Sequence, residues 1–181
     1  MRAPIGGAML HRSRDRGDRA KVVFGNRHRP AETPGSSATV LQCGAMNWLV
    51  KEEPTHYGFD AFVKDKKAVW SGVRNALAQK HLRAIKKGDR VFYYHTGDER
   101  AVVGIATAVS DPYPDPEDRS GKYVAVDLAP VKRLPRPVTL AEIKADAAFK
   151  DFPLVRIARL SVMPVTDAQW ARIEGLAAHA N

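Results

Sequence analysis

Two short segments about twenty residues apart carry the residue types that hold a flat, polar, aromatic molecule. Each places a tryptophan beside charged or amide side chains and close to a residue that bends the backbone, Pro54 in the first and Gly72 in the second. Tryptophan offers a stacking face, while the charged and amide groups can hydrogen-bond to a ligand's edge, and nucleobases are the commonest ligands of this kind. The segments are Trp48-Leu49-Val50-Lys51-Glu52-Glu53-Pro54 and Trp70-Ser71-Gly72-Val73-Arg74-Asn75.

The same segments, read as W-L-x-K-x-E-P and W-x-G-V-R-N, resemble the EVE domain, a member of the PUA-like superfamily. Further stretches fit that family in order along the chain, at 82–89, 92–95, 103–106, 113–115 and 159–165. The resemblance implies an α/β (α+β) fold, a PUA-like, mostly antiparallel β-barrel with peripheral helices. It also implies a pocket for a modified base and no catalysis.

The resemblance assigns the base pocket to ten residues: Trp48, Lys51, Glu53, Trp70, Gly72, Val73, Arg74, Asn75, Tyr93 and His95. The chain departs from the family at two places. Glu52 stands where the family has the serine of K-S-E-P, so a carboxyl replaces a small hydroxyl and the preferred base is in question. After His95 the family has serine and asparagine, whereas this chain has Thr96 and Gly97, which keeps the hydroxyl and loses the amide.

Each candidate also has a purely structural interpretation. Trp48 and Trp70 can fill the core, and Asn75 can simply cap the helix that follows it. Arg74 can pair with a carboxylate such as Glu53, and a histidine at a strand end can bond to backbone. Side chains alternate along a strand, so Trp48 and Lys51 should point to opposite faces unless the strand bends.

A basic stripe is predicted to contact phosphates. Residues 75–87 form the clearest helix of the sequence, with an apolar stripe of Ala78, Leu82 and Ile85 and with Gly88 as its stop. Its separate basic stripe, Lys80, Arg83 and Lys87, could position a nucleic-acid backbone. The alternative is an ordinary solvated helix face.

The remaining elements are predicted as follows. Strands are expected at 47–51, 69–70, 90–95, 102–109, 123–131 and 160–165, and a proline- and aspartate-rich loop at 110–121. A short helix is expected at 59–63. Thr139 and Thr166 each begin a capping box, which predicts helices after both residues.

Composition divides the chain into two parts. The net charge is +9, and residues 1–45 carry eight Lys or Arg against three Asp or Glu, so more than half of the excess lies there. This segment has few large apolar groups, and we expect either a disordered basic extension or a mis-assigned start, with Met46 as the true first residue. Residues 46–181 are expected to form the EVE (PUA-like) domain.

Other classes of protein find little support. Cys43 is the only cysteine, so an internal disulfide and a cysteine-based zinc site are excluded, which fits a reducing, cytoplasmic setting. The six histidines show no ligand spacing, and the acidic loop at 111–118 does not match a calcium-binding pattern. We predict no metal, no cofactor, no catalytic residue and no membrane segment.

The sequence therefore predicts a non-catalytic module that binds DNA or RNA and holds a flipped, modified base in an aromatic pocket. Flipping costs a few kcal/mol, and stacking on an aromatic side chain returns roughly 1–3 kcal/mol per base. Two alternatives stay open. One is a nucleic-acid-processing enzyme on a related ASCH-type scaffold, with Lys51, Glu53 and His95 as the candidate groups. The other is a module that binds a small molecule or a protein through the same pocket.

Overall fold

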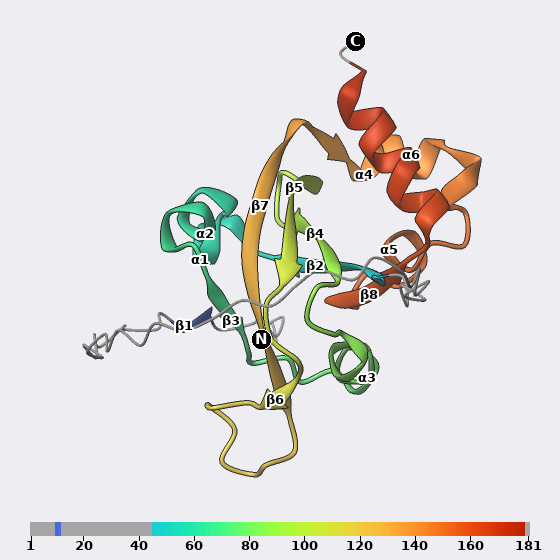
Figure 1. The fold of residues 1–181 in the computed structure, drawn as a ribbon. Helices are drawn as coiled ribbons and strands as arrows, with labels where there is room; N and C mark the ends of the chain where they lie inside the picture. Colours follow the sequence, from blue (N-terminus) through green and yellow to red (C-terminus); the bar gives the residue numbers. More distant parts are fainter. Residues whose placement is uncertain (1–9, 12–44, 180–181) are drawn as a thin grey trace, which may run out of the picture. The chain divides into compact units, whose positions relative to one another are not determined.

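The computed structural model describes residues 10–11 and 45–179, and one curled sheet organises them (Figure 1). The strands follow the order β1-β3-β7-β5-β4-β2-β8, and β6 pairs with β7 outside this path. All pairs are antiparallel except β2 with β4. The predicted fold class, mostly antiparallel α+β, is confirmed. The strands are β1 (Leu10–His11), β2 (Asn47–Glu52), β3 (Ala68–Trp70), β4 (Arg90–His95), β5 (Ala101–Ala108), β6 (Tyr113–Pro114), β7 (Val124–Thr139) and β8 (Val162–Val165).

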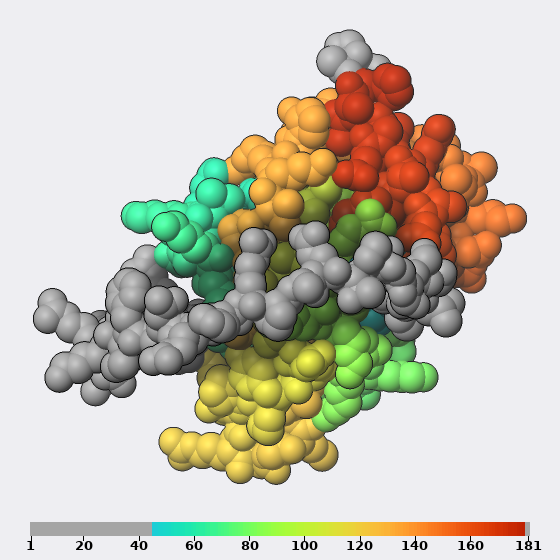
Figure 2. Space-filling model, viewed as in Figure 1, coloured from blue at the N-terminus to red at the C-terminus, as the bar shows by residue number. Residues whose placement is uncertain are grey.

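Helices flank the sheet on both sides. In Figure 1, α1 and α2 lie on one side of β7, and α4, α5 and α6 lie on the other. The loop between β6 and β7 extends away from the sheet, and it forms the yellow lower end of Figure 2. The helices are α1 (Pro54–Tyr57), α2 (Phe59–Asp65), α3 (Ala76–Ala84), α4 (Leu140–Ala145), the 3₁₀ helix η1 (Ala147–Phe149), α5 (Pro153–Arg156) and α6 (Asp167–Ala178).

Both predicted capping boxes are present. The hydroxyl of Thr139 accepts from the backbone N–H of Glu142, and Thr166 does the same for Gln169, so α4 and α6 begin where the sequence indicated. On α6 the side chains of Trp170, Ile173 and Ala177 are buried. The ring of Trp170 stacks on Phe92 of β4 at a centroid distance of 3.7 Å, which fixes α6 against the face of the sheet that carries Phe92. We call this face the outer face, and the opposite face, which carries Tyr93, the inner face.

Two predicted ends were wrong by three residues or more. Strand β7 continues to Thr139 instead of ending at residue 131, although it contains Pro130, Pro135 and Pro137. Its pairing with β5 shifts register twice, and such irregularities accommodate residues that lack an N–H. Helix α3 ends at Ala84, three residues early, because Ile85 adopts an extended conformation that leaves its side chain buried. Gly88, with φ of 96°, then belongs to the turn into β4 and not to a helix cap.

The extension predicted at 1–45 lies outside the described residues apart from β1 and Ala45. Strand β1 pairs antiparallel with β3, with Leu10 opposite Trp70. None of the helices described is long and apolar enough to cross a membrane.

Candidate functional site

The inner face of the sheet carries a cluster of aromatic side chains around Tyr93. The Trp70 ring meets Tyr93 edge-on at 5.7 Å, and Phe59 does so at 5.3 Å. Phe62 stacks on the opposite part of the same ring, also at 5.3 Å. Strand β3, strand β4 and helix α2 thus each contribute, and all four rings are fully buried. We call Phe59, Phe62, Trp70 and Tyr93 the aromatic cluster.

Two buried polar atoms beside this cluster have no hydrogen-bond partner within the described part of the chain. They are Nε1 of Trp70 and Oε2 of Glu52. Buried polar groups are nearly always bonded in folded proteins, so an unpartnered pair marks a place where a ligand or water can bond. Trp70 offers a donor. Glu52, which is only 2% exposed, offers a carboxyl whose other oxygen accepts from the backbone N–H of Glu53 at 3.0 Å.

Burial changes the chemistry of the Glu52 carboxyl. Removal from water disfavours its charged form and raises its pKa to about 7, and the charge of Glu53 adds to the effect. Near neutral pH, Glu52 can therefore donate as an acid or accept as a carboxylate. Tyr93 stays neutral, because burial raises its pKa further and its hydroxyl donates to the carbonyl oxygen of Tyr57 at 2.7 Å.

Trp48 lies on the inner face at the other end of β2, away from these two atoms along the strand. Its Nε1 donates to Oδ2 of Asp89 at 2.8 Å, and the ring packs on His81 of α3 at 6.1 Å. Asp89 also accepts from the backbone N–H groups of Met46 and Lys86, each at 2.9 Å. Trp48 is thus bonded into the junction of β2, α3 and β4.

Lys51 occupies the outer face of the same strand, as side-chain alternation predicted. Its Nζ donates to the carbonyl oxygen of Ala158 at 3.0 Å and lies 5.7 Å from the centre of the Tyr94 ring. It borders a pocket of about 310 Å³ that also includes Arg100 and Lys144. Lys51 and the aromatic cluster are therefore separated by the sheet.

Glu53 and His95 lie at the ends of the two central strands. The Glu53 carboxylate accepts from the Thr96 hydroxyl at 2.7 Å. Nε2 of His95 accepts from the backbone N–H of Phe59 at 3.0 Å, so Nδ1 carries the proton and donates to Glu99 at 2.5 Å. Both ring nitrogens of His95 are therefore occupied, Nε2 by the start of α2 and Nδ1 by the turn between β4 and β5. Lys51, Glu53 and His95, the groups considered for catalysis, do not converge on one point.

The turn Gly72–Asn75 is fixed by a buried carboxylate. Asp115 accepts from the backbone N–H of Gly72 at 3.0 Å, and its other oxygen accepts from Glu117. Arg74 lies 3.6 Å from the same carboxylate and 4.4 Å over the Tyr123 ring. The partner of Arg74 is therefore Asp115, and not Glu53 as the structural interpretation suggested.

The last two residues of the turn support the helix behind it. Asn75 caps α3, because its Oδ1 accepts from the N–H groups of Leu77 and Ala78 at 3.0 Å each. Val73 is buried, and its carbonyl oxygen accepts from the side chain of Gln79 at 2.9 Å.

The predicted basic stripe is not one helix face. Lys87 lies beyond the end of α3, and its backbone N–H donates to Asp111. Arg83 donates to the carbonyl oxygen of Lys122 at 2.6 Å, while Lys80 is exposed. These three residues stay candidates for phosphate contacts, although they come from two different local structures.

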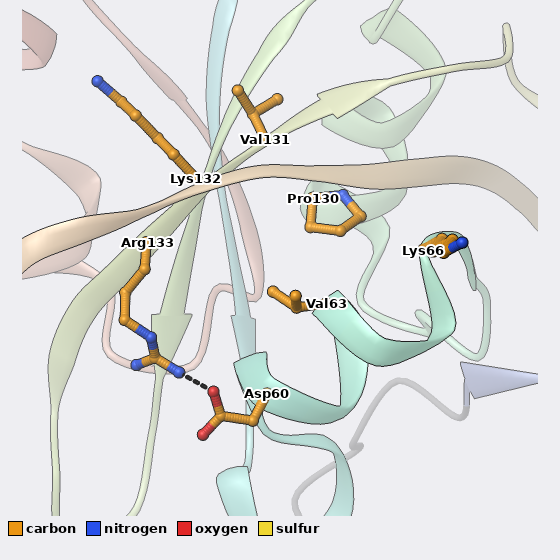
Figure 3. Close-up of a pocket in the computed structure, with 7 residues that line it drawn as sticks. All are labelled: Asp60, Val63, Lys66, Pro130, Val131, Lys132 and Arg133. Atoms are coloured by element: carbon orange, nitrogen blue, oxygen red, sulfur yellow. Dashed lines mark hydrogen bonds and ion pairs between the residues drawn. The ribbon is translucent and has the colours of Figure 1, made fainter.

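A second groove, of about 380 Å³, runs along the outside of α2 and β7 (Figure 3). An ion pair between Asp60 and Arg133 crosses it, and Val63 of α2 faces Pro130 of β7. Val63 and Val131 are 48% and 59% exposed, so the groove is a mixed surface feature without a buried polar group. No group of three or more His, Cys, Asp or Glu in the part of the chain that the structure describes is placed to hold a metal ion.

Sequence reasoning missed several residues of these sites. It noted Glu52 only as a departure from a family pattern, although alternation along β2 places it on the face of Trp48 and Val50. Phe59 and Phe62 were assigned only to a short helix. Arg100 and Lys144 lie far apart in the sequence and carry no local signal.

Comparison with known proteins gives a consistent family. The model of the EVE domain matches residues 46–176. Thymocyte nuclear protein 1 of chicken is 30% identical over 176 residues, which cover 78% of this chain and 72% of that protein.

Solved structures show the same fold. A protein of Rhodopseudomonas palustris, determined by NMR, shares 43% identity and a TM-score of 0.69 over 75% of this chain and 97% of its own. Human THYN1 in complex with DNA that contains 5-methylcytosine shares 26% identity and a TM-score of 0.68, over 76% of this chain and 100% of its own.

Proposed function

The chain belongs to the EVE domain family, and we propose that its residues 46–181 form a non-catalytic module that binds a modified base in a nucleic-acid strand. The observation that carries this proposal is the human relative with the same fold, which was solved with DNA containing 5-methylcytosine. The aromatic cluster and its two unpartnered polar atoms supply the matching chemistry in this chain.

In the proposed mode of binding, the base leaves the strand and its plane lies against Trp70, with Tyr93 beside it. Its edge bonds to Nε1 of Trp70 and to the Glu52 carboxyl. A neutral carboxyl both donates and accepts, which suits the neighbouring acceptor N3 and amino group N4 of a cytosine. The site of the base is therefore set by residues of β2, β3 and β4.

Both side chains are buried, so the base reaches them only when a covering segment moves. We propose that it enters beside the turn Gly72–Asn75. This turn is attached to the 110–121 loop through the carboxylate of Asp115. Flipping costs a few kcal/mol, and stacking returns roughly 1–3 kcal/mol. Hydrogen bonds to Trp70 and Glu52 add the remaining stabilisation for either base, and apolar contact with the 5-methyl group supplies the selectivity.

The test compares the full-length chain on matched DNA and RNA strands that contain either cytosine or 5-methylcytosine. We expect a preference of about tenfold for the modified strand, equivalent to about 1.4 kcal/mol. Trp70→Phe keeps an aromatic ring in the core but removes the unpartnered N–H together with part of the indole ring. This variant should bind both strands more weakly, because one hydrogen bond contributes about 1 kcal/mol.

Trp170→Phe is the matched control. It removes the N–H of a tryptophan on the outer face, where Nε1 donates to Glu174 at 2.9 Å. The control should keep the wild-type affinity for both strands. Equal affinity of the wild-type chain for both strands, or an unchanged affinity in Trp70→Phe, would contradict the proposal.

A further inference from the structure

The pocket on the outer face of the sheet collects positive charge from three separate elements. Lys51 belongs to β2, Arg100 directly precedes β5, and Lys144 belongs to α4. All three line one cavity of about 310 Å³, which is the lower limit of ordinary small-molecule sites. Two of these elements meet here because the end of β7 pairs with the start of β5, with Thr139 opposite Ala101. Helix α4 follows directly after Thr139 and therefore begins beside Arg100.

The ammonium group of Lys51 is half-buried and lacks a counter-ion. Within the described residues its hydrogen-bond partner is a backbone carbonyl, that of Ala158, and no carboxylate lies within ion-pair distance. Burial lowers the pKa of Lys51 to about 8. Charges taken out of water are normally paired, so this lysine is poised to accept an anion.

Arg100 is held in a strained position at the rim of the pocket. Its φ of 42° is unusual for a residue with a side chain. Its Nε donates to the carbonyl oxygen of Gly97 at 3.0 Å, and its own carbonyl oxygen accepts from Leu140 at 2.7 Å. These bonds fix the guanidinium while its terminal nitrogens stay available. Strain of this kind concentrates at functional sites.

The rest of the lining is mostly apolar. Leu140, Leu154 and Val155 form one wall, and the Tyr94 ring lies behind Lys51. One acidic group lies at the pocket's edge, because the Glu53 carboxylate is bonded to the hydroxyl of Thr96, which lines the pocket. The cavity therefore suits a compact anion joined to a less polar body.

We propose that this pocket binds the phosphate group of a nucleotide through Lys51, Arg100 and Lys144. A phosphate carries up to two negative charges and several acceptor oxygens, which matches three cations better than a single carboxylate does. The sugar lies against Leu140 and Leu154. The phosphate can come from a free nucleoside monophosphate or from a strand, and only the second source rests on the function proposed above.

The experiment measures affinity of the full-length chain by calorimetry. The probes are deoxycytidine 5′-monophosphate, deoxycytidine, and a single-stranded oligonucleotide with and without 5-methylcytosine. The variants are Lys51→Met, which preserves the apolar stem, and Lys144→Ala, which alters an exposed side chain. Lys64→Ala is the control, since it removes the same charge from an exposed position on α2 outside the pocket.

If the phosphate is free, the monophosphate should bind at least about tenfold more tightly than the nucleoside, and each pocket variant should weaken it by about tenfold. If the phosphate belongs to a strand, the oligonucleotide alone should bind, and the same variants should weaken it and lower its salt dependence. Lys64→Ala should change either affinity by less than about twofold.

Equal effects of Lys64→Ala and the pocket variants on every probe would overturn the proposal, because they would reveal a general charge effect. So would pocket variants that leave both the monophosphate and the oligonucleotide unaffected. Failure of the base-binding function is a separate result, the absence of any preference for 5-methylcytosine in the wild-type chain. If Lys51→Met binds more weakly but keeps the preference for 5-methylcytosine, the phosphate pocket and the base site are separate and lie on opposite faces of the sheet.

Discussion

Glu52 is a carboxyl group set among aromatic side chains, one residue from an ammonium group that points to the other face of the sheet. Where the family pattern has a serine, a longer and ionisable side chain reaches the aromatic cluster. Its free oxygen cannot be satisfied by the backbone, because only Oε1 meets the N–H of Glu53. The replacement of serine by Glu52 therefore lowers the stability of the folded chain, and it also supplies a carboxyl oxygen that can hydrogen-bond to a ligand.

Glu52→Gln should make stability less dependent on pH. The folded chain holds the Glu52 proton more tightly than the unfolded chain, since the pKa rises from 4.5 to about 7 on folding. Stability should therefore decline as pH rises between these values. At pH 8 the neutral glutamine should stabilise the chain by about 1–3 kcal/mol, and at pH 4.5 the gain should vanish.

Urea denaturation at the two pH values measures this difference. Glu53→Gln is the matched control, because it neutralises the adjacent carboxyl, which is bonded to Thr96 and not buried beside the cluster. It should stabilise the chain at pH 8 much less than Glu52→Gln does, because it relieves only the repulsion between the two carboxylates and not the burial of a charge. A Glu52→Gln variant with the same stability difference at both pH values would refute the buried-acid interpretation.

Among the elements, the packing of α2 onto β5 depends on one glycine. Gly104 faces the ring of Phe59, and a Cβ at this position would overlap that ring. Phe59 in turn packs edge-on against Tyr93, so the absence of a side chain in β5 allows the aromatic cluster to close. The space beside Gly104 is filled by the Phe59 side chain from α2.

Gly104→Ala should destabilise the chain by about 1–3 kcal/mol, because an added methyl group forces Phe59 out of its position. Gly175→Ala in α6 is the control, since nothing lies within 4 Å of its added Cβ. In a helix this exchange should be neutral or stabilise by up to about 1 kcal/mol. Thermal unfolding of both variants measures the contrast, and equal melting temperatures would show that α2 shifts without cost.

The elements also show what the sequence could predict. Residues 90–95 carry apolar groups on both faces and have a polar residue at each end, so β4 was predicted at its observed limits. Capping boxes are local, and α4 and α6 were found for that reason. The end of α3 and the length of β7 depend on tertiary packing. Burial of Ile85 overrides helix propensity, and register shifts in β5 accommodate the prolines.

The candidate sites were predictable to a similar extent. Trp70, Tyr93 and the turn at Gly72 could be named as candidates because each lies within a contiguous motif. Alternation along β2 correctly placed Lys51 opposite Trp48. The contact of Arg74 with Asp115, and the gathering of Arg100 and Lys144 beside Lys51, depend on chain segments that only the fold brings together.

Across the whole molecule, two neighbouring groups on opposite faces should shape the stability profile. Glu52 makes stability decline from pH 4.5 to about 7. The folded pKa of Lys51, about 8, lies below its ordinary 10.5, so stability should rise again as pH passes from 8 to 10.5. Tyr94, Arg100 and Lys144 are the titratable groups around Lys51. Stability should therefore be lowest between about pH 7 and 8.

Equilibrium denaturation from pH 4.5 to 10.5 measures this profile. Lys51→Met should remove the alkaline rise and leave the acidic limb unchanged, whereas Lys64→Ala should alter neither. A profile that is flat above pH 8 in the wild-type chain would contradict the burial of the Lys51 charge.

The pairing of β2 constrains the order in which the chain can fold during synthesis. β2 is the first strand of the EVE domain to leave the ribosome, yet it pairs with β4 in parallel and with β8 almost at the end of the chain, with Asn47 opposite Val165. One edge of β2 therefore stays unpaired until nearly all other strands have been made, and such edges favour aggregation. The strand that carries Lys51 and Glu52 is completed last, so neither proposed site can exist on a nascent chain.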